Sequence, residues 1–362
     1  MRKNNKFTVV GLVLAMSLLV GCNEQTAGSS DEPTKANKTY KWKMVTTWPA
    51  NFPIFQTGAE RFAKDVKIMS NGRLDINVFA GGELVPPLGV FDAVQQGQVE
   101  MGHGGAYYWS GKVPAVQFMS TVPFGMPASG ADAWHYAGDG LKLWNENYAS
   151  FKLKAFPLGN TGAQMGGWFN KKIESTEDLK GLKMRIPGLG GKVLAKAGGN
   201  PILMAASELY TALERNTIDA TEWVGPYHDL RLGLHRAAKY YYYPGWHEPG
   251  TSLELLINQV AWDSLSPDLQ KIVEVAAAAN NVWMHAEFEA RNQEALQEIK
   301  EKHTHIEILK FPKEVLAEFK RLTEETLLEE AEKDPAFKKV YENYKAFSEK
   351  NAELKAITES IH

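Results

Sequence analysis

The sequence predicts an α/β protein built from two similar lobes, each a β-sheet with flanking helices. Three observations lead to this prediction. The chain has 362 residues, which is too long for one ordinary domain and suits two of roughly 150 residues each. Segments that alternate like strands take turns with amphipathic segments, which favours a mostly parallel sheet covered by helices. One helix–strand segment also recurs in similar form later in the chain.

The first 22 residues have the composition of a signal peptide. Basic residues are followed by an apolar run of about fourteen residues, Phe7 to Val20, which is too short to span a bilayer comfortably. It ends in Leu-Val-Gly-Cys, and this Cys22 is the only cysteine, so an internal disulfide is excluded. The ending resembles a bacterial lipobox; the alternative is a chance cysteine after a cleaved signal. We expect lipidation at Cys22, with residues 23–39 as a polar, flexible tether.

The first lobe is expected to follow the tether directly. Its strands are short segments that alternate between apolar and polar residues. Its first helix is indicated by apolar residues that recur at helical spacing from Phe55 to Val66 and by the Asn71-Gly72 stop that follows. The predicted order is a strand at 40–48, this helix, a strand at 73–79, a helix at 87–97 and a strand at 99–104.

The repeated segment supports a second lobe of the same kind. Residues 209–221 resemble residues 90–102, at an offset of 209 − 90 = 119 positions. Each copy reads as an amphipathic helix that ends in a residue suited to a left-handed cap, Gly97 or Asn216. The alternative is that any α/β unit has this appearance. Strands of the second lobe are predicted in residues 151–159, 166–171 and 181–187.

A long helix and a helical tail complete the chain. Ser266 is a good N-cap, Pro267 suits the first helical position, and neither proline nor glycine follows until about Lys302. A continuous helix of about 36 residues would be roughly 54 Å long, so it crosses both lobes or breaks. Two further helices are predicted in the tail. The last carries an apolar stripe, which packs on its own body or on a partner chain: Phe337, Val340, Tyr341, Tyr344 and Phe347.

The sequence contains no motif for catalysis. Residues 188–192, Gly-Leu-Gly-Gly-Lys, fail the pattern of a phosphate-binding loop, because Val193 stands where serine or threonine is needed. Neither the Gly-x-Ser-x-Gly elbow nor the His-Glu-x-x-His zinc motif is present. Paired carboxylates mean little in a chain with 43 acidic residues, and a net charge of −3 gives no electrostatic case for nucleic acid.

Polar groups gather among aromatic residues and glycines at four expected strand ends, where open α/β sheets bind ligands. Arg185 ends one of these strands, and its planar guanidinium suits a carboxylate. Gln164, Glu222 and Glu248 offer oxygens, which suit a hard cation such as Na⁺ or Ca²⁺ better than zinc. The alternative for Arg185 is a structural ion pair with Glu222.

Long segments of the chain resemble the substrate-binding subunits of TRAP (tripartite ATP-independent periplasmic) transporters, across nearly all of residues 40–350. Residues 81–102 match that family's pattern of glycine, Glu-Leu, an amphipathic helix and a Gly-x-Val-[Glu/Asp]-Met strand. Gly181 to Gly188 match its arginine segment. Within the family, residues 106–126, Thr-Glu-Trp-Val-Gly-Pro-Tyr-His-Asp and Gly-Trp-His-Glu-Pro-Gly resemble the branch that binds 2-oxo acids and lactate.

The resemblance implies roles for individual residues. Arg185 matches the arginine that clamps the ligand carboxylate. Gln164, Glu222 and Glu248 match metal-coordinating side chains, and the Trp223 backbone carbonyl adds an oxygen, so that the metal bridges protein and carboxylate. Gln164 is therefore also expected to contribute to the substrate site. The walls of the pocket are expected to be formed by Trp48, Phe52, Tyr107 and Tyr108.

For the fold, the resemblance implies a two-lobed arrangement like that of periplasmic binding proteins, with a mixed sheet in each lobe and a long helix spanning both. The expected segments are 40–130 plus about 221–260 for the first lobe, 131–220 plus about 261–312 for the second, and 313–362 for C-terminal helices. The branch also forms homodimers through exchanged C-terminal helices, which would explain the stripe.

For the function, the resemblance implies an extracytoplasmic solute-binding protein rather than an enzyme. It would capture a small monocarboxylate, such as pyruvate, another 2-oxo acid or lactate, with Na⁺ or Ca²⁺, and deliver it to the membrane subunits of a TRAP transporter. One alternative is a carboxylate-binding lipoprotein that feeds a sensor. Another is a glycoside hydrolase, with Glu222 and Glu248 as its paired carboxylates.

Overall fold

The computed structural model describes residues 38–359. The predicted signal peptide, Cys22 and residues 23–37 of the tether lie outside this range, and their expected roles stay predictions. Within the described range no helix has the length and apolar character needed to cross a membrane.

A mixed five-stranded sheet forms the centre of the first lobe. Its strand order is β2-β1-β3-β10-β4. Strand β1 runs parallel to β2 and β3, whereas β10 runs antiparallel to β3 and β4. The strands are β1 (Tyr40–Thr46), β2 (Leu74–Phe79), β3 (Met101–Gly104), β4 (Leu153–Asn160) and β10 (Ser252–Asn258).

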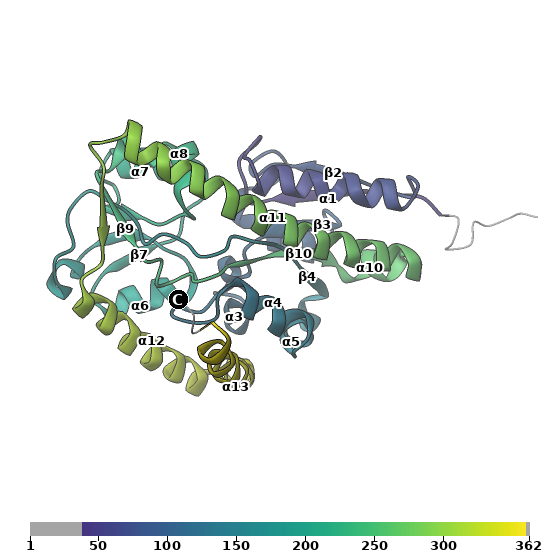
Figure 1. Ribbon diagram of the computed structural model, residues 1–362. Coiled ribbons are helices and arrows are strands. Elements are labelled where there is room, and N and C mark those ends of the chain that lie inside the picture. The colour runs from purple at the N-terminus through teal and green to yellow at the C-terminus, as the bar shows by residue number, and fades with distance from the viewer. Residues whose placement is uncertain (1–37, 360–362) are drawn as a thin grey trace, which may run out of the picture.

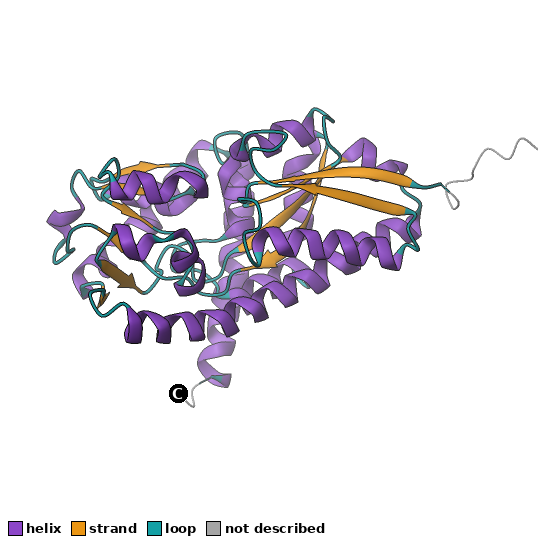
Figure 2. Cartoon of the chain, turned by 90° about the horizontal axis from the view of Figure 1, so that it is seen from above, coloured by secondary structure: helices purple, strands orange, loops and turns teal. Residues whose placement is uncertain are grey.

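A mixed six-stranded sheet forms the centre of the second lobe, in the order β11-β9-β5-β8-β6-β7. Strand β6 is parallel to β7 and β8, and β5 is antiparallel to β8 and β9. Figure 2 shows the two groups of strands side by side, with helices around each. The strands are β5 (Gly167–Phe169), β6 (Lys183–Arg185), β7 (Asn200–Ile202), β8 (Ala220–Thr221), β9 (Tyr240–Tyr243) and β11 (Glu307–Lys310).

Two strands, β4 and β9, do not lie in the lobe in which they were expected. Residues 151–159 were expected in the second lobe, but β4 pairs with β10 in the five-stranded sheet. Residues from 221 to 260 were expected in the first lobe, but β9 pairs with β5 and β11 in the six-stranded sheet. The reason is that alternation predicts a strand but carries no information about its partner, which here lies far away in sequence. The chain therefore crosses between the lobes after β4 and again before β10.

The repeated helix–strand segment is confirmed as an equivalent unit in each lobe. Helix α2 (Val90–Gln95) precedes β3, and α7 (Ala206–Glu214) precedes β8. The predicted left-handed caps are also confirmed, because φ is 70° at Gly97 and 55° at Asn216. The other helices up to the long one are α1 (Phe55–Met69), α3 (Gln117–Ser120), α4 (Ala128–Tyr136), α5 (Gly140–Tyr148), α6 (Gly188–Lys196), α8 (Pro226–Leu232), α9 (Leu234–Ala237) and α10 (Gln259–Ser264).

The long helix α11 is continuous from Pro267 to Lys302, as predicted. It packs on β4 and α1 of the first lobe and on α8 of the second. Figure 1 shows it running along the molecule from the region of α10 to that of α8. Apolar side chains on α11, including Val273 and Phe288, contribute to the cores of both lobes. The helix is therefore a shared support for the two sheets.

The C-terminal helices α12 (Lys313–Lys333) and α13 (Pro335–Thr358) pack against each other and against the body. The predicted stripe of α13 is confirmed, and of the two alternatives its buried members follow the first, because they pack on the chain's own body. Phe337 packs on Phe118, with ring centroids 4.8 Å apart. Tyr344 packs on Trp134, and its hydroxyl accepts a hydrogen bond from the Met126 backbone N–H. The chain's own helices α3 and α4 thus cover this face.

Candidate carboxylate and metal site

The predicted polar residues meet between the two sheets. Arg185 is the last residue of β6, and Glu222 directly follows β8. Gln164 lies in the connection from β4 to β5, and Glu248 lies in the connection from β9 to β10. All four side chains are buried. The expectation that each lies near a strand end is confirmed, and the two connections belong to the segments that pass between the lobes.

Arg185 is held on three sides by hydrogen bonds. Nη1 donates to the Glu222 carboxylate, Nε donates to the Met204 carbonyl at 3.3 Å, and Nη2 donates to the Tyr108 hydroxyl at 3.3 Å. The structural ion pair considered from the sequence is therefore present, between groups that are 2% and 1% exposed. Tyr108 belongs to the first lobe, so the guanidinium contacts both lobes.

Aromatic rings surround this cation. The Arg185 guanidinium stacks over Trp223 at 5.1 Å from the ring centroid. Trp48 and Phe52 each lie 6.2 Å from Trp223, both edge-on. These three rings bring the first lobe against the second, because Trp48 and Phe52 follow β1 whereas Trp223 follows β8.

Tyr107 and Tyr108 lie beside the site in a short 3₁₀ turn, Ala106–Trp109, after β3. Their ring centroids lie 4.8 Å apart. Gly188, the first residue of α6, lies directly against Tyr107: a Cβ at this position would be 2.9 Å from the Tyr107 Cβ. Gly188 also has a φ of 58°, which favours glycine. A small residue at the start of α6 therefore allows the two lobes to approach closely.

Gln164 and Glu248 form a second polar group beside Arg185. Gln164 Nε2 donates to Glu248 Oε2 at 2.7 Å and to Thr161 Oγ1 at 3.1 Å. Thr251 Oγ1 donates to the same Glu248 oxygen. Gln164 Oε1 is buried and has no hydrogen-bond partner. A buried amide oxygen without a donor is costly, which is the situation expected of an oxygen that coordinates a cation.

His247 is a member of the site that the sequence did not single out. Its Nε2 lies 3.3 Å from Glu222 Oε2. Among residues 38–359, the side chains of Glu222, His247 and Glu248 form the one group of three that could hold a metal ion, with ligand atoms all within 4.8 Å of one another. Its position next to Glu248 was the available signal. The two carboxylates and the Gln164 oxygen make an oxygen-rich set that fits a hard cation.

The site is electrostatically unbalanced. Burial, and after it the charge of Glu222, raises the pKa of Glu248 to about 7. Burial lowers the pKa of Arg185, but the Glu222 carboxylate and the two tyrosines outweigh this effect, so that the net pKa is raised. Burial, with nearby Glu248 next, also raises the pKa of Tyr107. One cation therefore faces two buried carboxyl groups, and an additional positive charge would stabilise both in their ionised form.

Asp229 is a further buried carboxylate that the sequence did not predict. Its Oδ1 accepts a hydrogen bond from the Val224 backbone N–H at 3.3 Å. Its Oδ2 accepts from Trp168 Nε1 at 3.0 Å and from the Tyr241 hydroxyl at 2.7 Å. These bonds fix the backbone directly after Glu222 and Trp223 to the second lobe.

Comparison with known proteins identifies relatives along most of the chain. The profile of bacterial extracellular solute-binding proteins, family 7 (DctP), matches residues 44–334. A monocarboxylate 2-oxoacid-binding periplasmic protein of Nostoc sp. is 46% identical over 347 residues, which cover 96% of this chain and 94% of that protein.

Two solved structures resemble the chain closely. One is a TRAP periplasmic solute-binding protein from Pseudoalteromonas atlantica with bound sodium and pyruvate, at 45% identity. The other, from Colwellia psychrerythraea, has bound calcium and pyruvate, at 46% identity. Each gives a TM-score of 0.87 and covers 89% of this chain and 98% of its own. The chain belongs to the family 7 bacterial extracellular solute-binding proteins, the solute receptors of TRAP transporters.

Proposed function

We propose that the protein captures a small monocarboxylate, pyruvate or another 2-oxo acid or lactate, together with a metal cation. It then delivers the solute to the membrane subunits of a TRAP transporter. The observation that carries the proposal is the buried group of Arg185, Glu222, Gln164 and Glu248 between the lobes. The pyruvate bound with sodium or calcium in the two similar structures supports it.

Charge explains why a cation belongs in this site. A bound monocarboxylate would add a third negative group to Glu222 and Glu248, against the single guanidinium of Arg185. The balance of one positive and three negative charges calls for one or two further positive charges, which Na⁺ or Ca²⁺ supplies. We assign the cation to Gln164, Glu222 and Glu248 with the Trp223 backbone carbonyl. Arg185 would hold the ligand carboxylate, with Gln164 beside it.

Aromatic side chains from both lobes suit a site that encloses a small solute. Trp48, Phe52, Tyr107 and Tyr108 are assigned to the walls, and the first three of them are less than 10% exposed. A ligand enclosed by residues from both lobes favours the closed arrangement, because only that arrangement makes all of its contacts. The membrane subunits would then distinguish the loaded receptor by its closed shape.

A thermal-shift screen tests the ligand class. The protein is heated with pyruvate, longer 2-oxo acids, lactate, dicarboxylates and sugars, each with Na⁺, with Ca²⁺ and after chelation. A small monocarboxylate at 100 times its dissociation constant is expected to add about 2.7 kcal/mol of stability, but only with a cation present. Stabilisation by dicarboxylates or sugars alone would contradict the assignment. Recovery of the ligand chemically unchanged would separate this receptor from the glycoside hydrolase alternative.

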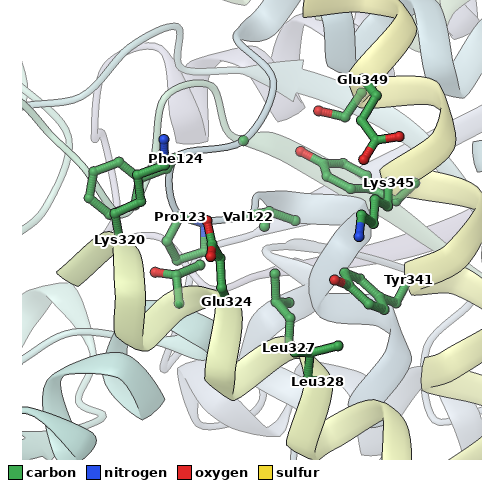
Figure 3. Close-up of a pocket in the computed structure, with 14 residues that line it drawn as sticks. Val122, Pro123, Phe124, Lys320, Glu324, Leu327, Leu328, Tyr341, Lys345 and Glu349 are labelled. Carbon is green, nitrogen blue, oxygen red and sulfur yellow. The ribbon is translucent and has the colours of Figure 1, made fainter. Parts of the chain in front are cut away.

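We also propose that the protein is a homodimer through its C-terminal helices. The buried stripe is covered internally, but Leu328 on α12 and Leu354 on α13 are more than half exposed. A hollow of about 460 Å³ lies between α12, α13 and residues 122–125, and Figure 3 shows Leu327, Leu328 and Tyr341 lining it. Sedimentation equilibrium is expected to give a dimer mass at micromolar concentration. A monomer mass at that concentration would reject the proposal.

A further inference from the structure

A buried histidine joins the two lobes behind the site. His228 lies on α8 of the second lobe, and its Nε2 is 2.8 Å from the carbonyl oxygen of Pro53 in the first lobe. The side chain is completely buried. Its ring lies 4.4 Å from Phe52, 4.6 Å from Phe55 and 4.7 Å from Phe288. Two of these rings belong to the first lobe and the third to α11.

The polarity of this hydrogen bond follows from its surroundings. Burial lowers the pKa of His228 to about 3, in spite of the bond to Pro53. The ring is therefore neutral at physiological pH. Because its Nε2 faces a carbonyl oxygen, that nitrogen carries the proton and donates. Nδ1 is buried without a partner, so Nε2 makes the one hydrogen bond of this ring that the structure shows.

The acceptor is presented by an unusual turn. Ile54 has φ 62° and ψ −55°, a strained conformation for a β-branched residue. The Phe55 backbone N–H also donates to the Pro53 carbonyl, at 2.7 Å. Strain of this kind persists only where the surrounding contacts enforce it, and it is concentrated at ligand clamps and switches. Here the turn directs the carbonyl of Pro53 across the lobe boundary toward His228.

A short series of contacts connects this hydrogen bond to the ligand site. The ring of His228 packs on Phe52. Phe52 in turn packs edge-on against Trp223, at 6.2 Å. Trp223 lies under the guanidinium of Arg185. The hydrogen bond therefore forms only when the first lobe meets the second. The same meeting brings Phe52, an expected wall of the site, against Trp223.

We propose that His228 is a positioning residue, a latch that closes the lobes over the ligand by donating to the Pro53 carbonyl and holding Phe52 against Trp223. The inference rests on the proposed function in so far as a solute is enclosed between the lobes. A contact made only in the closed state slows ligand release, because the solute leaves after opening. It does not affect entry into the open state.

The test compares two substitutions of equal length. His228→Met removes the donor, whereas His228→Gln places an amide N–H where Nε2 stands. Association and dissociation rates of pyruvate with Ca²⁺ are measured by stopped-flow tryptophan fluorescence on the full chain. His228→Met is expected to raise the dissociation rate about 5- to 10-fold, as the loss of one hydrogen bond implies. Its association rate stays within about 2-fold, and His228→Gln keeps both rates near wild type.

A second histidine in the chain provides the control. His135 is also buried, and its Nε2 lies 3.1 Å from the Met119 carbonyl, but both residues belong to the side of the five-stranded sheet. His135→Met is expected to lower the melting temperature and to leave both rates unchanged. An unchanged dissociation rate in His228→Met would overturn the latch. A similar rise in the dissociation rate of His135→Met would also overturn it. So would a fall in the association rate of His228→Met as large as the rise in its dissociation rate.

A measurement without ligand separates the latch from the ligand assignment. Wild type that binds no pyruvate would reject the proposed ligand, not the latch. Because the hydrogen bond involves no atom of the solute, the latch also keeps part of the ligand-free wild type closed. In solution X-ray scattering, ligand-free His228→Met is therefore expected to have a larger radius of gyration than ligand-free wild type and His228→Gln. Equal radii for the three proteins would overturn the latch whichever solute the protein binds.

Discussion

Arg185→Ala is expected to weaken monocarboxylate binding by at least about 100-fold, the scale of removing one partner from a buried charge pair. Among the described residues of the site the guanidinium is the one permanent cation, and hydrogen bonds to Glu222, Met204 and Tyr108 fix its direction. No other donor in the site offers two parallel charged N–H groups to a carboxylate. Isothermal titration with pyruvate in Ca²⁺ measures the effect.

The same substitution leaves Glu222 buried beside an empty space, so a loss of about 3–5 kcal/mol in stability is also expected. Binding must therefore be measured well below the melting temperature. Arg185→Lys keeps the charge and separates the two effects: it is expected to fold, but to bind about tenfold more weakly because it lacks the planar fork. Arg215→Ala, at the exposed arginine that follows α7, is the control and is expected to bind normally. Wild-type affinity in Arg185→Ala would reject the assignment.

Features with a local physical cause could be predicted from the sequence. The long helix begins at Pro267 and ends at Lys302 as predicted, because a proline at the first helical position and the absence of proline and glycine after it are local signals. The Ser266 side chain, predicted as the N-cap, makes no capping hydrogen bond. The left-handed conformations of Gly97 and Asn216 follow from helix termination in the same way. The position of Arg185 at a strand end is predictable because it stands between the apolar residues Met184 and Ile186, just before Pro187.

Features that depend on distant partners could not be predicted. The pattern of β4 is that of any strand, and its pairing with β10 is decided by packing some hundred residues further along the chain. His247 approaches Glu222 only because two connections fold back to the same place. The apolar stripe of α13 can be recognised in the sequence from its helical periodicity. Periodicity does not show whether the chain's own α3 or another molecule covers the stripe.

The closed arrangement combines both kinds of feature. Arg185, Glu222 and Trp223 are placed by strand ends of the second lobe, and the residues that complete their surroundings come from the turn after β1 and the turn after β3. None of these contacts would survive a separation of the lobes. Burial of the ionisable groups and closure of the lobes are therefore one event, and the charges of the site determine which solutes favour it.

Glu222→Gln is expected to weaken the cation dependence of binding more than any other isosteric change in the site. Glutamine keeps the shape of the side chain and still accepts from Arg185, so the fold is retained, but the charge that would face the cation is lost. The Ca²⁺ concentration for half-maximal pyruvate binding is expected to rise about 100-fold. The corresponding rise for Na⁺ is expected to be smaller, because Ca²⁺ carries twice the charge. Glu314→Gln, at an exposed position of α12, is the matched control. Titration of pyruvate at several cation concentrations measures the shift, and an unchanged Ca²⁺ requirement in Glu222→Gln would place the cation elsewhere.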